Sequence, residues 1–212
     1  MRKPVVFLIR ISDNPVSMWF AGRSYESWTK AGYGVQIVEA VTPATMGDDG
    51  IKINIAPIKK MGRQRRPFSE TEKAIFYSHA KVLSIIARKT SPAIVIEHDA
   101  ELIKPLPEEE LNKLDIASLG GIMGFPEFAG IPNQPKSNSW RSTPALAYFI
   151  KPPTAKLLYN HLTTIKCEGN VDAYINDFMI KYGTNSKFNT HVNHMYDATV
   201  GNTIIHPILP DN

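Results

Sequence analysis

The sequence predicts a single α/β domain with a mostly parallel central sheet. Three observations support this class: the chain opens with a β-α-β pattern, apolar strands alternate with amphipathic helices, and 212 residues suit one such domain. The hydrophobic fraction is 43% and the charged fraction is 21%, which is ordinary for a globular protein. We therefore expect one packed domain over residues 1–212, without internal repeats or a linker.

The first third of the chain predicts a β-α-β unit. Residues 5–11 form an apolar run followed by Ser-Asp-Asn-Pro, which is typical of a buried strand that ends in a turn. Apolar residues recur at helical spacing over 15–31 until Gly32 stops the pattern. Residues 35–41 predict the second strand. A helix between two such strands implies parallel pairing with a right-handed crossover.

The next segment predicts a loop, a helix and a third strand. Residues 47–67 hold glycines, prolines and many basic residues, so we expect a basic loop or insertion there. Ser69 and Glu72 fit a capping box, which predicts a helix from this point to about Ala87. Residues 93–96 are apolar and β-branched, as expected for a buried strand.

The C-terminal half predicts further strands and helices on either side of a long loop. Strands are expected at 116–119 and 145–150, and helices at 153–162 and 172–182. Residues 120–143 are rich in Gly, Pro, Asn and Ser. A loop of this length is usually functional or disordered.

Composition also bears on the compartment and on the partners. No apolar run is long enough for a membrane span or a secretory leader, and the lone Cys167 excludes an internal disulfide and a cysteine zinc cage. We expect a cytoplasmic protein without a transmembrane segment. The net charge is +4, and a basic cluster lies between positions 59 and 66. Such a cluster attracts phosphates, nucleic acid or an anionic membrane, although a solvated loop explains it equally well. Its members are Lys59, Lys60, Arg63, Arg65 and Arg66.

Acidic residues follow the third predicted strand directly. In open α/β sheets, ligands bind beyond the carboxyl ends of the strands. Glu97 and Asp99 are two residues apart, so they point to the same side if the chain stays extended, whereas His98 is expected to point into the fold. Two carboxylates suit one hard divalent cation, Mg or Mn. The alternative is a solvated turn.

Several segments in the middle of the chain carry a family resemblance. They are Phe76-Tyr77-Ser78-His79, Ile96-Glu97-His98-Asp99, Ala147-Tyr148-Phe149-Ile150, Ala155-Lys156-Leu157-Leu158 and Val171-Asp172. Together they resemble glycosyltransferase family 25, which includes lipopolysaccharide and collagen sugar transferases. A departure is His98, which replaces the middle acid of the family's triplet. A second set of segments resembles a bacteriophage-encoded branch: Ser27-Trp28, Glu39-Ala40-Val41-Thr42-Pro43, Thr71-Glu72-Lys73-Ala74-Ile75 and Glu97-His98-Asp99.

The resemblance implies an activity and a fold. It implies a GT-A type, Rossmann-like fold and a metal-dependent, inverting transfer of a sugar from a nucleotide-sugar donor, with a UDP-sugar as the best guess and Mn or Mg as the metal. Asp172 matches the family's Val-Asp and is the predicted general base, with a helix N-cap as the alternative role. The predicted metal ligands are Glu97, Asp99 and His194, and Asp99 also counts as catalytic. Whether His98, His191 or His206 touches the metal is left open.

Candidate donor-binding residues follow from the strand ends and from the family pattern. Arg10 lies in an otherwise apolar strand, where a guanidinium is costly unless it meets an anion or carbonyl groups. Ser12 lies beside it, and Thr42 ends the second strand. Arg23 is a possible second phosphate group, and His79 is assigned a supporting role in binding, although a core histidine is the more common explanation.

We expect the acceptor to approach residues 120–143. Two acceptors and one non-catalytic function are open. The phage resemblance and the basic cluster favour a hydroxymethylated pyrimidine in phage DNA, modified in the host cytoplasm after base extrusion. The alternative acceptor is a saccharide of the lipopolysaccharide core at a membrane surface. A third possibility is a non-catalytic nucleic-acid-binding protein on a decayed transferase fold, which the retained acids Glu97, Asp99 and Asp172 disfavour.

Overall fold

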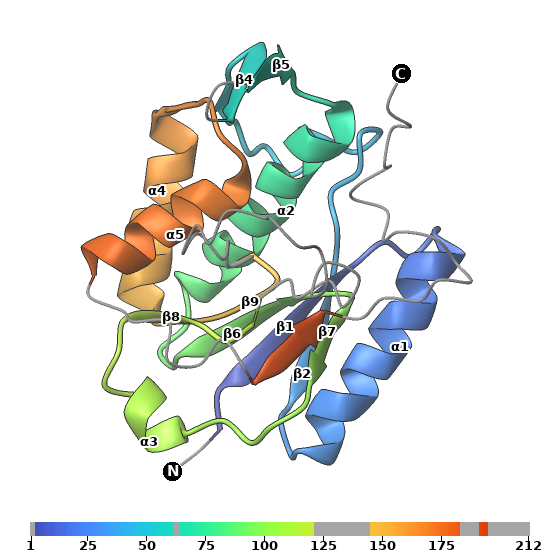
Figure 1. The fold of residues 1–212 in the computed structure, drawn as a ribbon, viewed down its shortest axis with the longest axis vertical. Coiled ribbons are helices and arrows are strands. Elements are labelled where there is room, and N and C mark those ends of the chain that lie inside the picture. Colours follow the sequence, from blue (N-terminus) through green and yellow to red (C-terminus); the bar gives the residue numbers. More distant parts are fainter. Residues whose placement is uncertain (1–2, 62–63, 121–144, 183–190, 195–212) are drawn as a thin grey trace, which may run out of the picture.

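The structure is a computed structural model of the 212-residue chain. It describes residues 3–61, 64–120, 145–182 and 191–194. A five-stranded sheet forms the centre (Figure 1), and its strands in spatial order are β2 (Val35–Glu39), β1 (Val5–Arg10), β6 (Ala93–Glu97), β9 (Ala147–Ile150) and β8 (Ile116–Ser118). Strands β2, β1 and β6 pair in parallel, while β9 pairs antiparallel with β6 and with β8. Within this sheet β9 is the reversed strand, so the predicted α/β class with a mostly parallel sheet is confirmed.

Helices cover both faces of the central sheet. Helix α1 (Pro15–Lys30) lies on one face, and α2 (Glu70–Ile86), α4 (Pro152–Thr164) and α5 (Val171–Lys181) lie on the other (Figure 1). The short helix α3 (Glu108–Leu111) precedes β8. In the described part of the chain, no helix combines the length and the apolar character that a membrane crossing requires.

Alternation along the central strands divides the core into two halves. Phe7 and Val95 belong to the half that packs under α2, α4 and α5, whereas Leu8 and Ile96 belong to the half under α1. Trp28 of α1 is fully buried in the second half, and its indole N–H donates to the carbonyl of Ala100 at 3.0 Å. Strands β1 and β6 are therefore buried on both faces, which explains their continuous apolar runs.

Three two-stranded pairs flank the sheet in the described residues. They are β10 (Lys166–Cys167) with β3 (Asn54–Ile55), β11 (Val192–His194) with β7 (Ala100–Leu102), and β4 (Ile58–Met61) with β5 (Gln64–Pro67). The first pair is parallel and the other two are antiparallel. The β7 strand continues the chain only two residues after β6, so the segment between them turns sharply at the edge of the sheet.

Local capping residues fix the starts of the two long N-terminal helices. The Asn14 side chain accepts hydrogen bonds from the amides of Val16 and Ser17 at 3.0 Å, and Pro15 occupies the first turn of α1. The predicted capping box of α2 is present, because Ser69 Oγ accepts from the Glu72 amide at 3.1 Å and Glu72 accepts from the Ser69 amide at 3.0 Å. Both helices match the expectations from the sequence.

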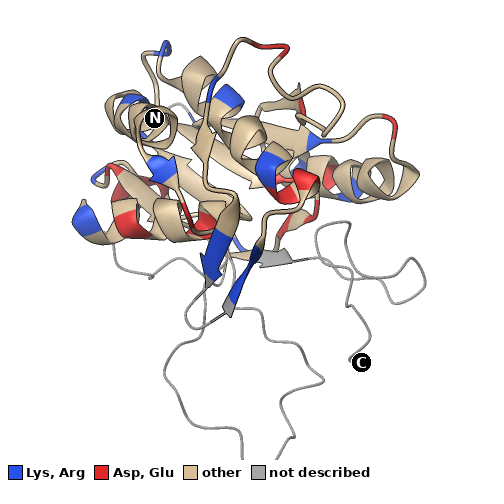
Figure 2. Cartoon of the chain, turned by 90° about the horizontal axis from the view of Figure 1, so that it is seen from above, with Lys and Arg blue, Asp and Glu red and all other residues tan. Residues whose placement is uncertain are grey.

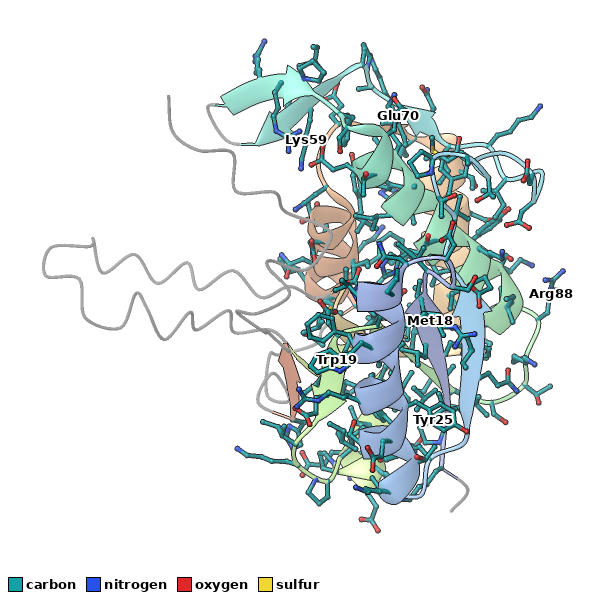
Figure 3. All side chains as sticks on the ribbon, turned by 90° about the vertical axis from the view of Figure 1, so that its right-hand side faces the viewer. Met18, Trp19, Tyr25, Lys59, Glu70 and Arg88 are labelled. Atoms are coloured by element: carbon teal, nitrogen blue, oxygen red, sulfur yellow. The ribbon has the colours of Figure 1, made fainter. Side chains whose placement is uncertain are left out.

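Residues 58–67 of the basic segment form a hairpin, which corrects the expected loop over residues 47–67 in this part. Strands β4 and β5 pair in antiparallel register and extend from the body of the molecule, with basic residues along both (Figure 2). Three of the basic side chains on these strands form ion pairs with acidic residues of other elements. The sequence pattern alone did not indicate these acidic residues. Lys59 is only 3% exposed, and Figure 3 shows it at the same end of the molecule as Glu70.

Glu72 is the acid that holds the hairpin on α2. Its carboxylate accepts from Lys59 and, at 2.7 Å, from two nitrogens of Arg66. Lys60 pairs with Glu168 at 2.6 Å. Burial opposes ionisation of Glu72, yet the hydrogen bonds from Arg66 and Lys59 hold its pKa at about 2. Much of the predicted anion-binding charge is thus neutralised within the protein, while Arg65 is exposed and Arg63 lies outside the described residues.

We expect Glu72→Gln to lower the free energy of unfolding by about 2–4 kcal/mol at pH 7, because it leaves the buried Lys59 ammonium without its counter-charge. Urea denaturation measures this change. Since the pKa of Glu72 falls from 4.5 to about 2 on folding, its contribution is present above pH 4.5 and is lost as the pH falls toward 2. The gap between the variant and the wild type should close over that range. Glu70→Gln is the control, because Glu70 is exposed and pairs only with Lys73 of the same helix among the described contacts. A similar loss in both variants would contradict the role of Glu72.

Candidate functional site

A pocket lies at the carboxyl ends of β1, β2 and β6. It has a cavity volume of about 150 Å³, and its largely apolar wall includes Ile11, Val41, Pro43 and Ile75. The chain leaves β1 for β2 on one side and later returns as β6 on the other side of β1. This is a topological switch point, where open α/β sheets bind ligands. From the sequence we expected ligands beyond the carboxyl ends of the strands, and the pocket lies at that edge.

Four of the residues proposed from the sequence border this pocket. They are Arg10, Thr42, His79 and Glu97. They come from β1, from the segment after β2, from α2 and from β6. The structure therefore brings together side chains that are up to 87 positions apart in the chain, between Arg10 and Glu97. Most of the predicted donor-binding set is in one place.

Glu39 ties the ends of β1 and β2 together beside the pocket. Its carboxylate accepts from Arg10 Nε at 3.1 Å and from the Ser12 amide at 3.2 Å. Ser12 contributes its main chain to this link, and its side chain is not part of the pocket wall. The charge of Arg10 is thus partly balanced, while its remaining guanidinium N–H groups can meet an anion.

A buried hydrogen-bonded chain ends at the pocket. His79 is 1% exposed, with Nδ1 3.1 Å from the Tyr148 hydroxyl and Nε2 3.4 Å from Glu97 Oε1. A carboxylate only accepts, so in the neutral ring Nε2–H donates to Glu97 and Nδ1 accepts from the tyrosine hydroxyl. Burial, together with the charge of Glu97, raises the pKa of Tyr148 far above its usual value, so Tyr148 keeps its proton. The hydrogen bonds from Tyr148 through His79 hold the Glu97 carboxylate in a defined orientation.

Asp172 lies in the first turn of α5 and does not cap it. The N-cap is Asn170, whose side chain accepts from the Ala173 amide at 3.1 Å. Asp172 instead accepts from the Ala145 amide at 3.0 Å and so joins α5 to the segment before β9. Burial, and then the negative charge of Glu97, raise the pKa of Asp172 to about 6, although the Ala145 bond opposes this rise. A carboxylate in this state can exchange a proton near neutral pH.

The turn after β6 differs from the extended chain that the sequence suggested. His98 was expected to point into the fold, away from Glu97. It is 5% exposed and its ring lies near Phe20 of α1, whereas Glu97 contacts His79 of α2, and both residues also border the pocket. Strand β6 ends at Glu97, so His98 lies in the turn that follows it. Asp99 is fully buried and is not part of the pocket wall.

The structure describes only some of the side chains that were predicted to bind a metal. Within the described residues, no group of three or more His, Cys, Asp or Glu side chains is arranged to hold a metal ion. The backbone of His194 pairs with Ala100, directly after Asp99, but the His194 side chain lies outside the description. The His191 carbonyl accepts from the Ile103 amide at 2.9 Å, and His206 lies outside the described residues. Metal binding by Glu97, Asp99 and His194 therefore stays a prediction.

Arg23 lies away from the pocket. It pairs with Glu101 at 3.8 Å and stacks over the ring of Trp19 at 5.2 Å, on the outer side of α1. Trp19 and Tyr25 are each 43% exposed. Figure 3 shows both side chains on this helix. A phosphate-binding role for Arg23 has no support in this arrangement. Residue 120 is the only position of the predicted acceptor loop 120–143 that the description includes.

Sequence reasoning missed Tyr148 as part of the site. Tyr148 is fully buried in β9. A tyrosine within the apolar run 145–150 could have indicated a buried polar contact, because a buried hydroxyl needs a hydrogen-bond partner. Its partner, His79, is 69 residues earlier in the chain. No local pattern connects the two residues.

Comparison with known proteins gives little further information. No family model matches the chain, and no curated protein matches it. Among solved structures, a similar chain is mouse xyloside xylosyltransferase 1 in its apo form, at 11% sequence identity over 88% of this chain and 78% of that chain, with a TM-score of 0.41. This likeness is too distant to carry an argument. The resemblance to glycosyltransferase family 25 and to a phage branch stays a prediction.

We expect Asp172→Asn to stabilise the protein above pH 6. The wild-type carboxyl has a pKa of about 6 when folded and 3.8 ordinarily, so it stabilises the fold when protonated and this contribution is lost as the pH rises through 6. The shift corresponds to at most about 3 kcal/mol, and asparagine keeps an oxygen to accept from Ala145. Thermal unfolding at pH 8 and at pH 4 measures the difference, which should nearly vanish at the lower pH. Asp177→Asn, on an exposed position of the same helix, is the control. A destabilised Asp172→Asn at pH 8 would show that the carboxylate is needed for the fold.

Proposed function

We propose that this protein is a glycosyltransferase that binds the nucleotide of a nucleotide-sugar donor in the pocket at the ends of β1, β2 and β6. One observation supports this most: an apolar cavity at a topological switch point is bordered by an arginine and by an oriented carboxylate. Its volume of about 150 Å³ is well below the roughly 300–1,000 Å³ of complete small-molecule sites. It therefore suits one flat ring of a larger ligand, and the rest of the ligand extends outside.

The polar border of the pocket suits the remaining parts of such a donor. Arg10 ends β1 at the pocket, and its side chain is 24% exposed, so its guanidinium can reach a phosphate. Glu97 can accept a hydrogen bond from a ring N–H, because His79 and Tyr148 hold it in place from the other side. Apolar walls, an anion-binding group and one oriented acceptor together match a nucleotide better than a free sugar.

Asp172 is the proposed general base. It would take the proton of the acceptor hydroxyl while the hydroxyl oxygen forms a bond to the anomeric carbon of the donor. The bond from that carbon to the diphosphate oxygen would break, and its electron pair would leave with the diphosphate. A single displacement of this kind inverts the anomeric centre. The pKa of about 6 places Asp172 close to the range in which a general base is most effective.

A divalent metal at Glu97 and Asp99 stays a prediction from the sequence. The Glu97 carboxylate is engaged by His79, and the Asp99 carboxylate is enclosed outside the pocket wall. These two groups do not present a shared open face in the described structure. Arg10 is the described cation at the pocket that can offset charge on the leaving diphosphate.

A saccharide hydroxyl is the acceptor that we place first. Duplex DNA was favoured by the five basic residues at positions 59–66, but Lys59, Lys60 and Arg66 pair with Glu72 and Glu168. The hairpin therefore presents much less net positive charge than the sequence suggests. A hydroxymethylated pyrimidine in phage DNA is the second candidate, because the hairpin projects from the body and carries the exposed Arg65 (Figure 2).

Asp172→Asn should lower sugar transfer by about two to four orders of magnitude while donor affinity stays nearly constant, because only proton removal is impaired. Calorimetry with a panel of nucleoside diphosphates and nucleotide sugars gives the affinity. Diphosphate release with saccharide acceptors gives the rate. Asp177→Asn should behave as wild type. An equal loss of donor affinity in Asp172→Asn would assign Asp172 a structural role, and no nucleotide binding by the wild type would reject the proposed function.

We expect binding to duplex DNA at about 150 mM salt to stay in the non-specific range, with a Kd of about 10⁻⁶ M or weaker. Arg65→Gln should change that affinity by less than threefold, because most of the basic side chains beside it are already paired. Fluorescence anisotropy between 50 and 300 mM salt tests this, with plain and hydroxymethylated duplexes compared. Clear preference for the modified duplex, with a steep salt dependence that Arg65→Gln reduces, would reverse the order of the two acceptors.

A further inference from the structure

His98 is a buried polar side chain that the proposed reaction does not use. It lies in the turn between β6 and β7, it is 5% exposed, and it lines the same pocket as Glu97. Its ring packs near Phe20 of α1, with a distance of 6.2 Å between the ring centroids. The imidazole is therefore held between the core under α1 and the pocket.

The two nitrogens of this ring have different surroundings. Nε2 is enclosed and has no hydrogen-bond partner among the described residues, whereas Nδ1 is not enclosed in this way. A buried N–H without an acceptor is unfavourable, so a proton on Nε2 would be costly. The tautomer with its proton on Nδ1 avoids this cost. The surroundings thus select one tautomer.

We propose that His98 is a specificity-determining residue of the pocket and that its Nδ1–H donates a hydrogen bond to the ring of the bound nucleotide. This inference rests on the proposed function. Glu97, the preceding residue, faces the same pocket as an acceptor that His79 orients. The pocket then offers a donor beside an acceptor between apolar walls. Its complement is a flat heteroaromatic ring that carries an acceptor next to a donor on one edge, which is the pattern of a nucleobase.

Three substitutions separate the roles of the two nitrogens. His98→Asn keeps an amide near the position of Nδ1, His98→Gln keeps one near Nε2, and His98→Phe keeps the ring shape without either nitrogen. The control is His161→Phe, the same change on α4, where the ring packs against Tyr174 and Phe178 outside the pocket.

Calorimetry with the tightest-binding nucleoside diphosphate should rank these variants. We expect His98→Phe and His98→Gln to bind about 3- to 10-fold more weakly than wild type, which is the range of one hydrogen bond. His98→Asn and His161→Phe should stay within about threefold. Affinity for inorganic pyrophosphate, which has no base, should not change in any variant. Unchanged nucleotide affinity in His98→Phe, rescue by glutamine instead of asparagine, or a parallel loss of pyrophosphate binding would each overturn the assignment.

The tautomer provides a test that needs no ligand. Long-range ¹H–¹⁵N correlation spectra of the wild-type protein, with the His98 signal assigned by its absence in His98→Asn, should show the Nδ1–H form. A ring protonated on Nε2 would contradict the proposal. If the wild type binds no nucleotide, the proposed function and this role of His98 both fall. If it binds nucleotide and the His98 variants bind equally well, only the role of His98 falls.

Discussion

The parallel pairing of β1 with β2 on one side and with β6 on the other is the constraint on which the rest of the structure depends. Its register sets Arg10 beside Glu39 and Ile9 beside Glu97, so the charged side chains at the ends of three strands meet at one edge. Both faces of β1 and β6 are buried, and the ionisable groups of these two strands are therefore confined to their ends. The pocket, its arginine and its carboxylate all follow from this one arrangement.

Much of the fold could be predicted from the sequence because its signals are local. The apolar runs of β1 and β6, the Asn14-Pro15 start of α1 and the Ser69–Glu72 capping box each lie within a few residues of one another, and each was found where the sequence placed it. The strand ends also indicated the edge at which polar groups collect, which located Arg10, Thr42 and Glu97 beside the pocket, whereas His79 of α2 was proposed from the family resemblance. Local chemistry and strand direction were sufficient for this much.

What the sequence did not show depends on long-range contacts. The hairpin lysines and arginine find their acids on α2 and after β10, so their charge could not be counted as free or paired from their neighbours in the chain. Tyr148 reaches His79 only because β9 pairs with β6 in one particular register. The His98 ring packs near Phe20 of α1, which is 78 positions earlier in the chain. Pairing register and turn position are set by tertiary structure.

The double role of Glu72 has a consequence for motion. The same carboxylate closes the first turn of α2 and anchors β4 and β5 through Lys59 and Arg66. The first two turns of that helix carry Thr71, Ala74 and Ile75, which form one side of the pocket. Fraying at the start of α2 would therefore release the hairpin and widen the pocket in the same event. These three elements constitute one cooperative unit of local unfolding, so hydrogen exchange should report a shared opening free energy for the hairpin amides and for the start of the helix.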